Sequence, residues 1–484
     1  MSQGRFNVEP ATALTLPAVC ATDQNGLALA TLANGKPAAL AAVRLSATDA
    51  FFVAYQQRSG ILMQLGGEVD LEGSLERPHL EQMVSYIVEQ WPRLGQCLDK
   101  TWLGLKWAGS CHTEQMLRVG NNHNGALAEW RNKPIDPFRE PPFQVLWIPA
   151  QRSGDPECGH ASNTVAFRAH HSAMDGESFV AVTMEAAHFL SCASGGRPTP
   201  TPRPAAVTTL KDLVSAKQLL RRRRLAAMWG YTRWLAAEAR AGQSTRLKVN
   251  AFATGDTHIC ERRLDCNVFV RLKQRATATR TAATWLCAAA WMRAIHAWNI
   301  SHDATSNPNI SLEFPVSLRH GQRRGRRDNQ DLLGNYISPL VVVGDATRPL
   351  EQLARELRKQ LIAGIRNQAH LGTPLITAPG KFLPWNLFQR VAVNPRTTGF
   401  ATSHFTWFEQ PDVCADIARL SGGALRVTGQ RIYTPVCLHM GAALAVLASP
   451  NYAQIFLTYR ETALSKASAE RLVDLMLAEL DGES

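Results

Sequence analysis

A proline-rich segment limits how this chain can fold. Residues 195–206 read GGRPTPTPRPAA and contain four prolines. Proline lacks the amide hydrogen that a sheet interior requires, and closely spaced prolines favour a stiff, extended backbone. The segment therefore predicts a linker at 196–208, between an N-terminal lobe at 1–195 and a C-terminal lobe at 209–484. Both lobes have sizes that are usual for a domain.

Strand and helix patterns occur on both sides of this linker. Apolar runs predict strands at Phe143–Ala150 and Thr164–His171, and helical periodicity predicts helices at Arg77–Gln90 and Gly176–Ala193. After the linker, the same patterns predict strands and helices that include Asn309–Ser317, Ala442–Ala448, Thr281–Trp298, Leu350–Arg366 and Ser465–Leu480. This mixture predicts an α/β or α+β fold.

The composition is that of an ordinary globular protein, with 45% hydrophobic and 19% charged residues. No run approaches 18 apolar residues, so we expect no membrane span. The ten cysteines include no C-x-x-C pair, which argues against a zinc or redox site and indicates reduced thiols. We therefore expect a cytoplasmic protein that binds no metal.

The formal net charge is +12, and the surface should attract acidic partners. Two basic clusters contribute to this charge, at Arg221–Arg224 and at Arg323, Arg324, Arg326 and Arg327. They are either solvated surface or a binding site for CoA phosphates or an acidic carrier protein. The chain has no zinc finger and no RNA-binding signature, so we expect no nucleic acid partner.

One short segment carries the chemistry. Residues 170–176 read HHSAMDG, directly after the predicted strand and before the predicted helix. Because side chains alternate along a strand, His170 and His171 should point to opposite faces, and only one can face a given site. The pair Asp175-Gly176 is typical of a turn, and the predicted helix begins at Gly176. Such a loop, held by a strand and a helix, is a favoured place for a catalytic histidine.

Simpler interpretations exist for each of these residues. Asp175 is also typical of a helix N-cap, and either histidine is compatible with a hydrogen-bonded place in the core. Two histidines and a carboxylate are also metal ligands. However, adjacent histidines on opposite strand faces cannot easily bind one ion, so we predict no metal at this segment.

The segment resembles the HHxxxDG signature of the CoA-dependent acyltransferase superfamily. That superfamily includes condensation domains of nonribosomal peptide synthetases, wax ester synthases, plant BAHD acyltransferases and chloramphenicol acetyltransferase. Other segments resemble the condensation-type members, namely Leu45–Asp49, Pro142–Ile148, Phe314–Arg319, Leu333–Tyr336 and the final helix Ser465–Leu480. The resemblance implies two chloramphenicol-acetyltransferase-like lobes in a V shape, with the active site in a tunnel between them.

The sequence lacks elements that are typical of some members of the superfamily, and these differences show which members it resembles most. Ala283-Thr284 stands where wax ester synthases have an Asn-Asp pair, and the DFGWG element of plant BAHD enzymes is absent. Phe51 replaces the arginine that condensation domains use as the ion-pair partner of the motif aspartate. The chain is thus most similar to free-standing condensation-type acyltransferases. Asp175 needs another partner, for which Arg44 and Arg319 are the candidates.

The resemblance also implies roles for individual residues. His171 would be the general base, Asp175 would hold the loop, and Gly176 would let the backbone approach the reacting carbon. His170 would pack away from the site. Ser403 and Asn335 are candidates for contact with the oxyanion or substrate. Alternatively, Ser403 is an ordinary strand serine and Asn335 holds a turn.

The function implied is transfer of an acyl group from a phosphopantetheine thioester to a hydroxyl or amine, in natural-product biosynthesis. The thioester would be carried by an acyl or peptidyl carrier protein or by CoA, and no cofactor would be bound permanently. The acceptor would be a small molecule, and the protein is expected to be a monomer. Two alternatives remain, an acyltransferase that uses free acyl-CoA and an inactive scaffold of the same fold.

Overall fold

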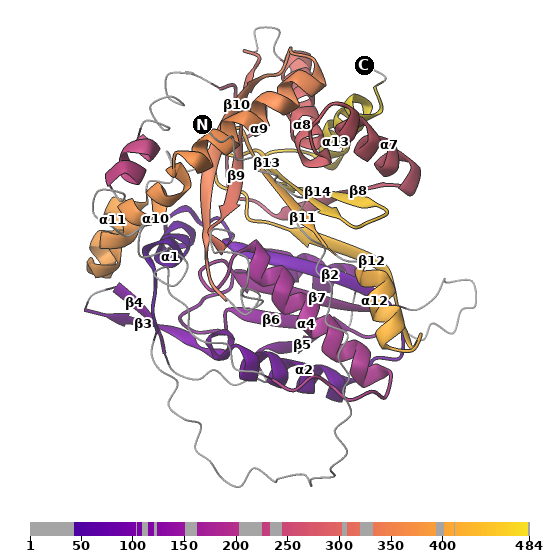
Figure 1. Ribbon diagram of the computed structural model, residues 1–484. Coiled ribbons are helices and arrows are strands. Elements are labelled where there is room, and N and C mark those ends of the chain that lie inside the picture. Colours follow the sequence, from indigo (N-terminus) through magenta and orange to yellow (C-terminus); the bar gives the residue numbers. More distant parts are fainter. Residues whose placement is uncertain are drawn as a thin grey trace, which may run out of the picture.

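The computed structural model describes residues 43–102, 104–108, 115–120, 123–150, 162–202, 225–232, 244–302, 307–319, 333–393, 401–410 and 412–482. Two large sheets lie one above the other in Figure 1, and each has helices packed on it. The predicted mixed α/β class is confirmed. The V shape and the tunnel stay predictions.

The first large sheet contains the strand that leads into the HHxxxDG segment. Its strand order is β12-β2-β7-β6-β5. The bounds are β2 (Gln64–Gly73), β5 (Leu117–Val119), β6 (Phe143–Ile148), β7 (Asn163–His170) and β12 (Leu425–Tyr433). Helices that accompany this sheet are α2 (Arg77–Gln90), α3 (His123–Asn132), α4 (Gly176–Ser194) and α12 (Val413–Leu420).

Strand β7 is buried on both faces. Its alternating side chains pack against an apolar core on one face and form hydrogen bonds on the other. Val165, Phe167 and Ala169 belong to the apolar core beneath α2 and α4. On the other face, Arg168 donates hydrogen bonds to the backbone oxygens of Trp130 in α3 and of Lys133. A buried polar group is tolerated when it is hydrogen-bonded in this way.

The second large sheet has the strand order β10-β9-β11-β13-β14-β8. The bounds are β8 (Thr257–Leu264), β9 (Asn309–Ser317), β10 (Ile337–Asp345), β11 (Ser403–Glu409), β13 (Ala442–Ala448) and β14 (Ala453–Arg460). Helices α7 (Cys266–Ala278), α8 (Ala283–His302), α9 (Leu350–Arg366) and α13 (Lys466–Asp481) cover one face of this sheet.

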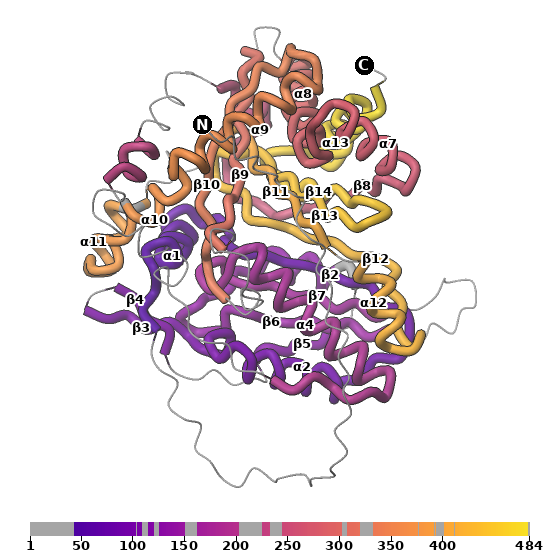
Figure 2. Tube along the Cα trace, viewed as in Figure 1, coloured from indigo at the N-terminus to yellow at the C-terminus, as the bar shows by residue number. Residues whose placement is uncertain are grey.

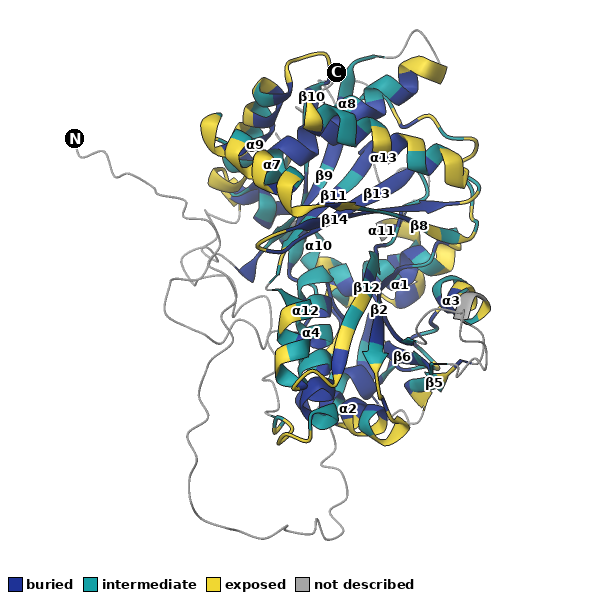
Figure 3. Cartoon of the chain, turned by 90° about the vertical axis from the view of Figure 1, so that its right-hand side faces the viewer, coloured by how far each residue is buried: buried dark blue, intermediate teal, exposed yellow. Residues whose placement is uncertain are grey.

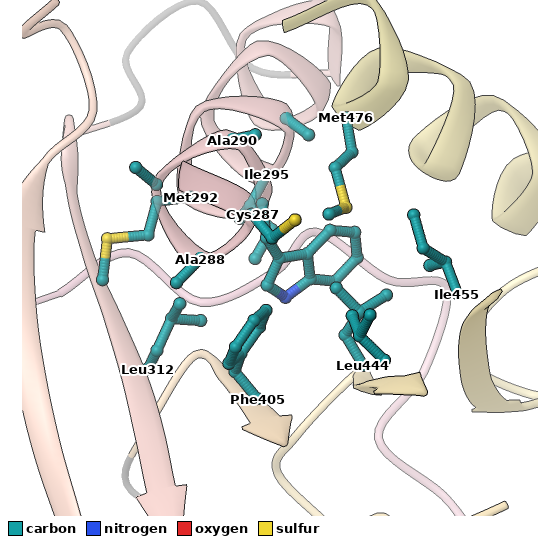
Figure 4. Packing of buried hydrophobic residues seen from close by; sticks show 14 of the residues in the cluster. Cys287, Ala288, Ala290, Met292, Ile295, Leu312, Phe405, Leu444, Ile455 and Met476 are labelled. Atoms are coloured by element: carbon teal, nitrogen blue, oxygen red, sulfur yellow. The ribbon is translucent and has the colours of Figure 1, made fainter. Parts of the chain in front are cut away.

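Helix α8 lies at the centre of that layer. Figure 4 shows Cys287, Ala288 and Ile295 of α8 packed among side chains from the sheet and from α13, including Leu312, Phe405, Leu444, Ile455 and Met476. A helix that is apolar on nearly all sides is stable only when it is surrounded by protein. Exposed residues instead gather on the outer helices, such as α7 and α9, in Figure 3.

The remaining elements lie beside the junction of the two halves. A small sheet has the order β1-β4-β3. Its strands are β1 (Val43–Arg44), β3 (Cys97–Thr101) and β4 (Gly104–Ala108). The helices are α1 (Ala47–Ser59), η1 (Pro92–Gly95), η5 (Ala369–Leu371), α10 (Gly372–Thr377), η6 (Ala378–Phe382) and α11 (Trp385–Ala392). Figure 1 places α1, α10 and α11 together.

Sheet membership does not follow the predicted division of the chain at the linker. Residues 412–433 fall within the predicted C-terminal lobe 209–484, yet they form α12 and the strand β12 that pairs with β2. Figure 2 traces this return of the chain to the N-terminal half. Without β12, the backbone groups along one edge of β2 would be unpaired. Of the predicted linker, residues 196–202 form neither helix nor strand, and the rest lies outside the described residues.

Two expectations from composition can be compared with the structure. In the described part of the chain, no helix combines the length and the hydrophobicity needed to cross a bilayer. The expectation of reduced thiols is wrong at Cys97, which is disulfide-bonded. The spacing of cysteines along the sequence excludes a C-x-x-C motif, but it does not show which cysteines meet in the fold.

The pairing of β12 with β2 can be tested by substitution of a glycine in β2. A Cβ atom added to Gly66 would lie 1.8 Å from Cζ of Tyr433 in β12, a buried ring. We expect Gly66→Ala to lower the free energy of unfolding by about 1–3 kcal/mol, measured by chemical denaturation, because overpacking displaces the ring. Gly67→Ala is the control, since its added Cβ would meet its nearest atom at 3.4 Å, an ordinary contact. Equal stability of the two variants would contradict this pairing.

Candidate active site

The HHxxxDG segment adopts the predicted strand, turn and helix. Strand β7 ends at His170, residues 171–175 form a loop that we call the motif loop, and α4 begins at Gly176. Asp175 is the N-cap of α4, and its carboxylate accepts a hydrogen bond from the amide of Ser178 at 2.9 Å. The His171 amide donates to the carbonyl of Met63, which holds the loop against the segment before β2.

The two histidines have different environments. His170 is fully buried, and its Nδ1 lies 2.7 Å from Oγ of Ser172. Burial, with a smaller contribution from His171, lowers the pKa of His170 to about 3, so this ring is neutral at ordinary pH. His171 stacks flat on Phe52 of α1, with ring centroids 3.8 Å apart. Phe52 thus fixes the plane of the His171 ring.

Asn335 determines which nitrogen of His171 carries a proton. Oδ1 of Asn335 lies 3.0 Å from Nδ1 of His171, and the amide nitrogen of Asn335 donates to the His171 carbonyl at 2.6 Å. The same amide nitrogen donates to Asp49 at 2.8 Å. Because both partners of the amide nitrogen are acceptors, Oδ1 must face His171, and it can only accept. Nδ1 of His171 is therefore protonated, and Nε2 keeps its lone pair.

Asp49 anchors Asn335 from the N-terminal half. It is the third residue of α1, where it forms a capping box with Ser46. Burial raises the pKa of Asp49, although Arg93 and the hydrogen bond from Asn335 oppose this effect. The Leu45–Asp49 segment thus contributes to the site through its aspartate.

Asp175 forms a buried ion pair with Arg319. The two guanidinium nitrogens Nη1 and Nη2 lie 2.8 and 2.9 Å from the two carboxylate oxygens. The Asp175 side chain is 0% exposed and that of Arg319 is 8% exposed. Burial opposes the charge on Arg319, but the interactions with Asp175 and Glu177 outweigh it, and the pKa of Arg319 is raised. Arg44, the other candidate, is exposed. It lies in β1, where it is the strand-pairing neighbour of Lys106 in β4.

The ion pair also fixes the residues on either side of Asn335. The Asp175 amide donates to the carbonyl of Gly334, and Arg319 donates to the same oxygen. The amide of Tyr336 donates to the Asp175 carboxylate at 2.8 Å. The chain is therefore held immediately before and after Asn335, which in turn holds His171.

Two predicted site residues have structural roles. A Cβ atom on Gly176 would lie 2.8 Å from Cζ of Phe408 in β11, so a larger residue here would have to displace the Phe408 ring. Ser403 is fully buried, donates to the carbonyl of Ala442 and accepts from Trp291 of α8. This geometry favours the alternative that Ser403 is an ordinary strand serine.

No family model matches the sequence, and no curated protein matches it. Solved structures do match over nearly the whole chain. One is the starter condensation domain of rhizomide synthetase RzmA, solved with C8-CoA and Leu-SNAC, with a TM-score of 0.62 and 14% identity, covering 91% of this chain and 94% of that chain.

Two further structures extend this likeness. The condensation domain of the monacolin K polyketide synthase MokA matches with a TM-score of 0.63 and 13% identity, covering 92% of this chain and 97% of that chain. Trichothecene 15-O-acetyltransferase from Fusarium sporotrichioides matches with a TM-score of 0.65 and 11% identity, covering 91% and 94%. The chain has the condensation-domain fold. The resemblance seen in the sequence is confirmed at the level of fold.

The structural role of Asp175 gives a prediction. Asp175→Asn should lower the free energy of unfolding by about 3–5 kcal/mol, because the variant removes the buried carboxylate and leaves the Arg319 charge with only the partly exposed Glu177 as an acidic partner. Glu177→Gln is the matched control, since Glu177 contacts the same guanidinium but its side chain is 36% exposed. Its cost should be about 1 kcal/mol or less. Thermal or chemical denaturation measures the stability of both variants. An equal loss of stability in the two would contradict a structural role for the buried Asp175–Arg319 ion pair.

Proposed function

We propose that this protein is an acyltransferase that moves an acyl group from a phosphopantetheine thioester to a hydroxyl or amine. His171 would be the general base. The observation that carries the proposal is the state of its ring: Asn335 fixes the proton on Nδ1, and no described residue bonds to Nε2. An imidazole with a free, oriented lone pair is the group that deprotonates an attacking nucleophile.

The environment of His171 supports this role. Burial lowers its pKa, and the opposing effects of its own backbone, Asp175 and Asn335 do not restore it. The ring is therefore neutral and ready to accept a proton at pH 7. An inactive scaffold would not require an asparagine, an aspartate and a stacked phenylalanine to orient one imidazole, so the network favours the enzyme.

The chemistry needs no covalent intermediate with this base. Nε2 of His171 accepts the proton of the acceptor hydroxyl or amine as the acceptor attacks the thioester carbonyl. The tetrahedral intermediate then collapses, the C–S bond breaks, and the thiolate takes the proton back from His171. Asp175 and Arg319 do not contact the reactants in this scheme, because both are occupied with each other. They position the loop, and Asn335 positions the ring.

The fold and the charge support a proposal for the donor class. Condensation domains are among the matching structures, and one was solved with C8-CoA. The net charge of +12 would speed encounter with an acidic carrier protein. The two arginine clusters of the sequence lie outside the described residues. We propose a carrier-bound thioester in natural-product biosynthesis as the donor, and free acyl-CoA is the second candidate.

The base assignment gives a direct prediction. His171→Ala should lower acyl transfer by about 10²–10⁴-fold, the usual contribution of a general base. His170→Ala should cost much less activity, because His170 is enclosed on the other side of the strand. Product formation is followed by mass spectrometry, with circular dichroism to verify the fold of both variants. Unchanged turnover in folded His171→Ala would rule out this role.

The donor assignment is tested by a comparison of salt dependence. We expect the acyl group on a carrier protein to give a higher kcat/KM than the matching acyl-CoA at low salt. The advantage should shrink as salt rises, because charges are screened over about 8 Å at physiological ionic strength. Equal or better kcat/KM with acyl-CoA, with no extra salt sensitivity for the carrier, would favour free acyl-CoA instead.

A further inference from the structure

Strand β11 presents two different faces. Ser403 bonds to Trp291 of α8, and Phe405 packs against Phe314 with ring centroids 5.3 Å apart, so these residues face the helices. Phe408 points the other way, against Gly176 at the start of α4. Because strand side chains alternate, His404 and Thr406 share the face of Phe408. They therefore line the side of β11 that is turned toward the motif loop.

Three polar side chains on this face are hydrogen-bonded in a row. Glu313 of β9 is the direct pairing neighbour of His404, and its carboxylate lies 3.3 Å from Nδ1 of the ring. Nε2 of His404 lies 2.6 Å from the hydroxyl oxygen of Thr406. The carboxylate can only accept, so Nδ1 carries the proton and Nε2 accepts the proton of the Thr406 hydroxyl.

This order of groups is the one that activates a hydroxyl nucleophile. A base within hydrogen-bond reach of a hydroxyl, itself oriented by a carboxylate, defines the arrangement of Ser-His-Asp hydrolases and their variants. Glu313, His404 and Thr406 occupy the three positions. We call them the β11 triad.

The β11 triad lies on the face of β11 that meets the motif loop. Thr406 is buried, with 7% of its surface exposed, and its two partners are less buried. The side chains of His404 and Glu313 are 18% and 25% exposed. The neighbours of His404 and Thr406 on β13 are Ala443 and Ala445. The contact of Phe408, on the same face as His404 and Thr406, with Gly176 places this face of β11 against the end of the motif loop.

We propose that Thr406 is a second, nucleophilic residue of this site, which accepts the acyl group of a thioester and releases it to water. The inference rests on the proposed function only in taking a thioester as the donor. The Thr406 oxygen attacks the carbonyl carbon, its proton moves to Nε2 of His404, and the C–S bond breaks as that proton passes to the leaving thiolate. Water then attacks the Thr406 ester, His404 takes the water proton and returns it to Thr406, and a carboxylic acid leaves.

The experiment uses octanoyl-N-acetylcysteamine thioester as the probe, with the full chain and no acceptor. Thiol release is followed with a thiol-reactive dye, and acid-quenched protein is analysed by intact mass and peptide mapping. We expect thiol release by the wild type and one octanoyl group on the peptide that contains Thr406. Thr406→Val and His404→Ala should each lower thiol release by at least about 10²-fold, the contribution of a lost nucleophile or base.

Two controls keep the inference falsifiable if a variant folds poorly. Thr406→Ser retains the hydroxyl and should retain thiol release and the acyl adduct. Ser403→Ala removes a hydroxyl from the other face of the same strand and should leave thiol release unchanged. Absence of an adduct on Thr406, together with thiol release that does not respond to Thr406→Val, would overturn the inference.

The failure of this inference can be told from the failure of the proposed function. In His171→Ala, thiol release without acceptor should persist while transfer to an acceptor is lost. If thiol release depends on His171 and not on Thr406, water is merely an acceptor for the His171 reaction, and the inference is overturned. If transfer survives in His171→Ala but is lost in Thr406→Val, the proposed function is wrong and the inference stands.

Discussion

The buried ion pair between Asp175 and Arg319 is the interaction on which the site depends. A carboxylate without solvent is stable only with its charge balanced and its oxygens hydrogen-bonded, and Arg319, Ser178 and Tyr336 supply these bonds. The pair connects the start of α4 in one half of the molecule to the end of β9 in the other. It also holds Gly334 and Tyr336, and therefore the segment that presents Asn335 to His171.

The alternation of side chains along strands decides which polar residues are available for chemistry. At the end of β7 it encloses His170 and leaves His171 to the loop. In β11 it turns Ser403 toward Trp291 and turns His404 and Thr406 toward the motif loop. A shift of one residue in either strand would exchange these sets, so the pairing registers of β7 and β11 are conditions for the proposed activity.

Local features of the structure could be predicted from the sequence. The bounds predicted for α2, α9 and β9 agree with those observed, because apolar periodicity within one element is visible in its own residues. For Asp175 the sequence offered a helix cap or an ion-pair partner, and the structure shows both roles. The strand and helix around the HHxxxDG segment were also predicted.

Contacts between distant segments could not be derived in this way. Asn335 and Asp49 are 286 residues apart, and Arg319 is 144 residues from Asp175. Nothing local to Arg44 or Arg319 shows which one reaches Asp175, because that depends on the order of strands in two sheets. Ser403 was a candidate because of the resemblance, and His404 was not considered. Which face of β11 meets the motif loop is decided by tertiary packing.

The pH dependence of kcat/KM tests most directly whether an oriented, neutral His171 is the base. Burial lowers the pKa of His171 from the ordinary histidine value of 6.5, so the neutral form persists below that pH and is lost only as the pH falls through the lowered pKa. Acyl transfer should therefore stay constant down to pH 6.5 and decline below it, and the residual activity of His171→Ala should lack this decline. An acid limb centred above pH 6.5, or one that survives in His171→Ala, would contradict the account.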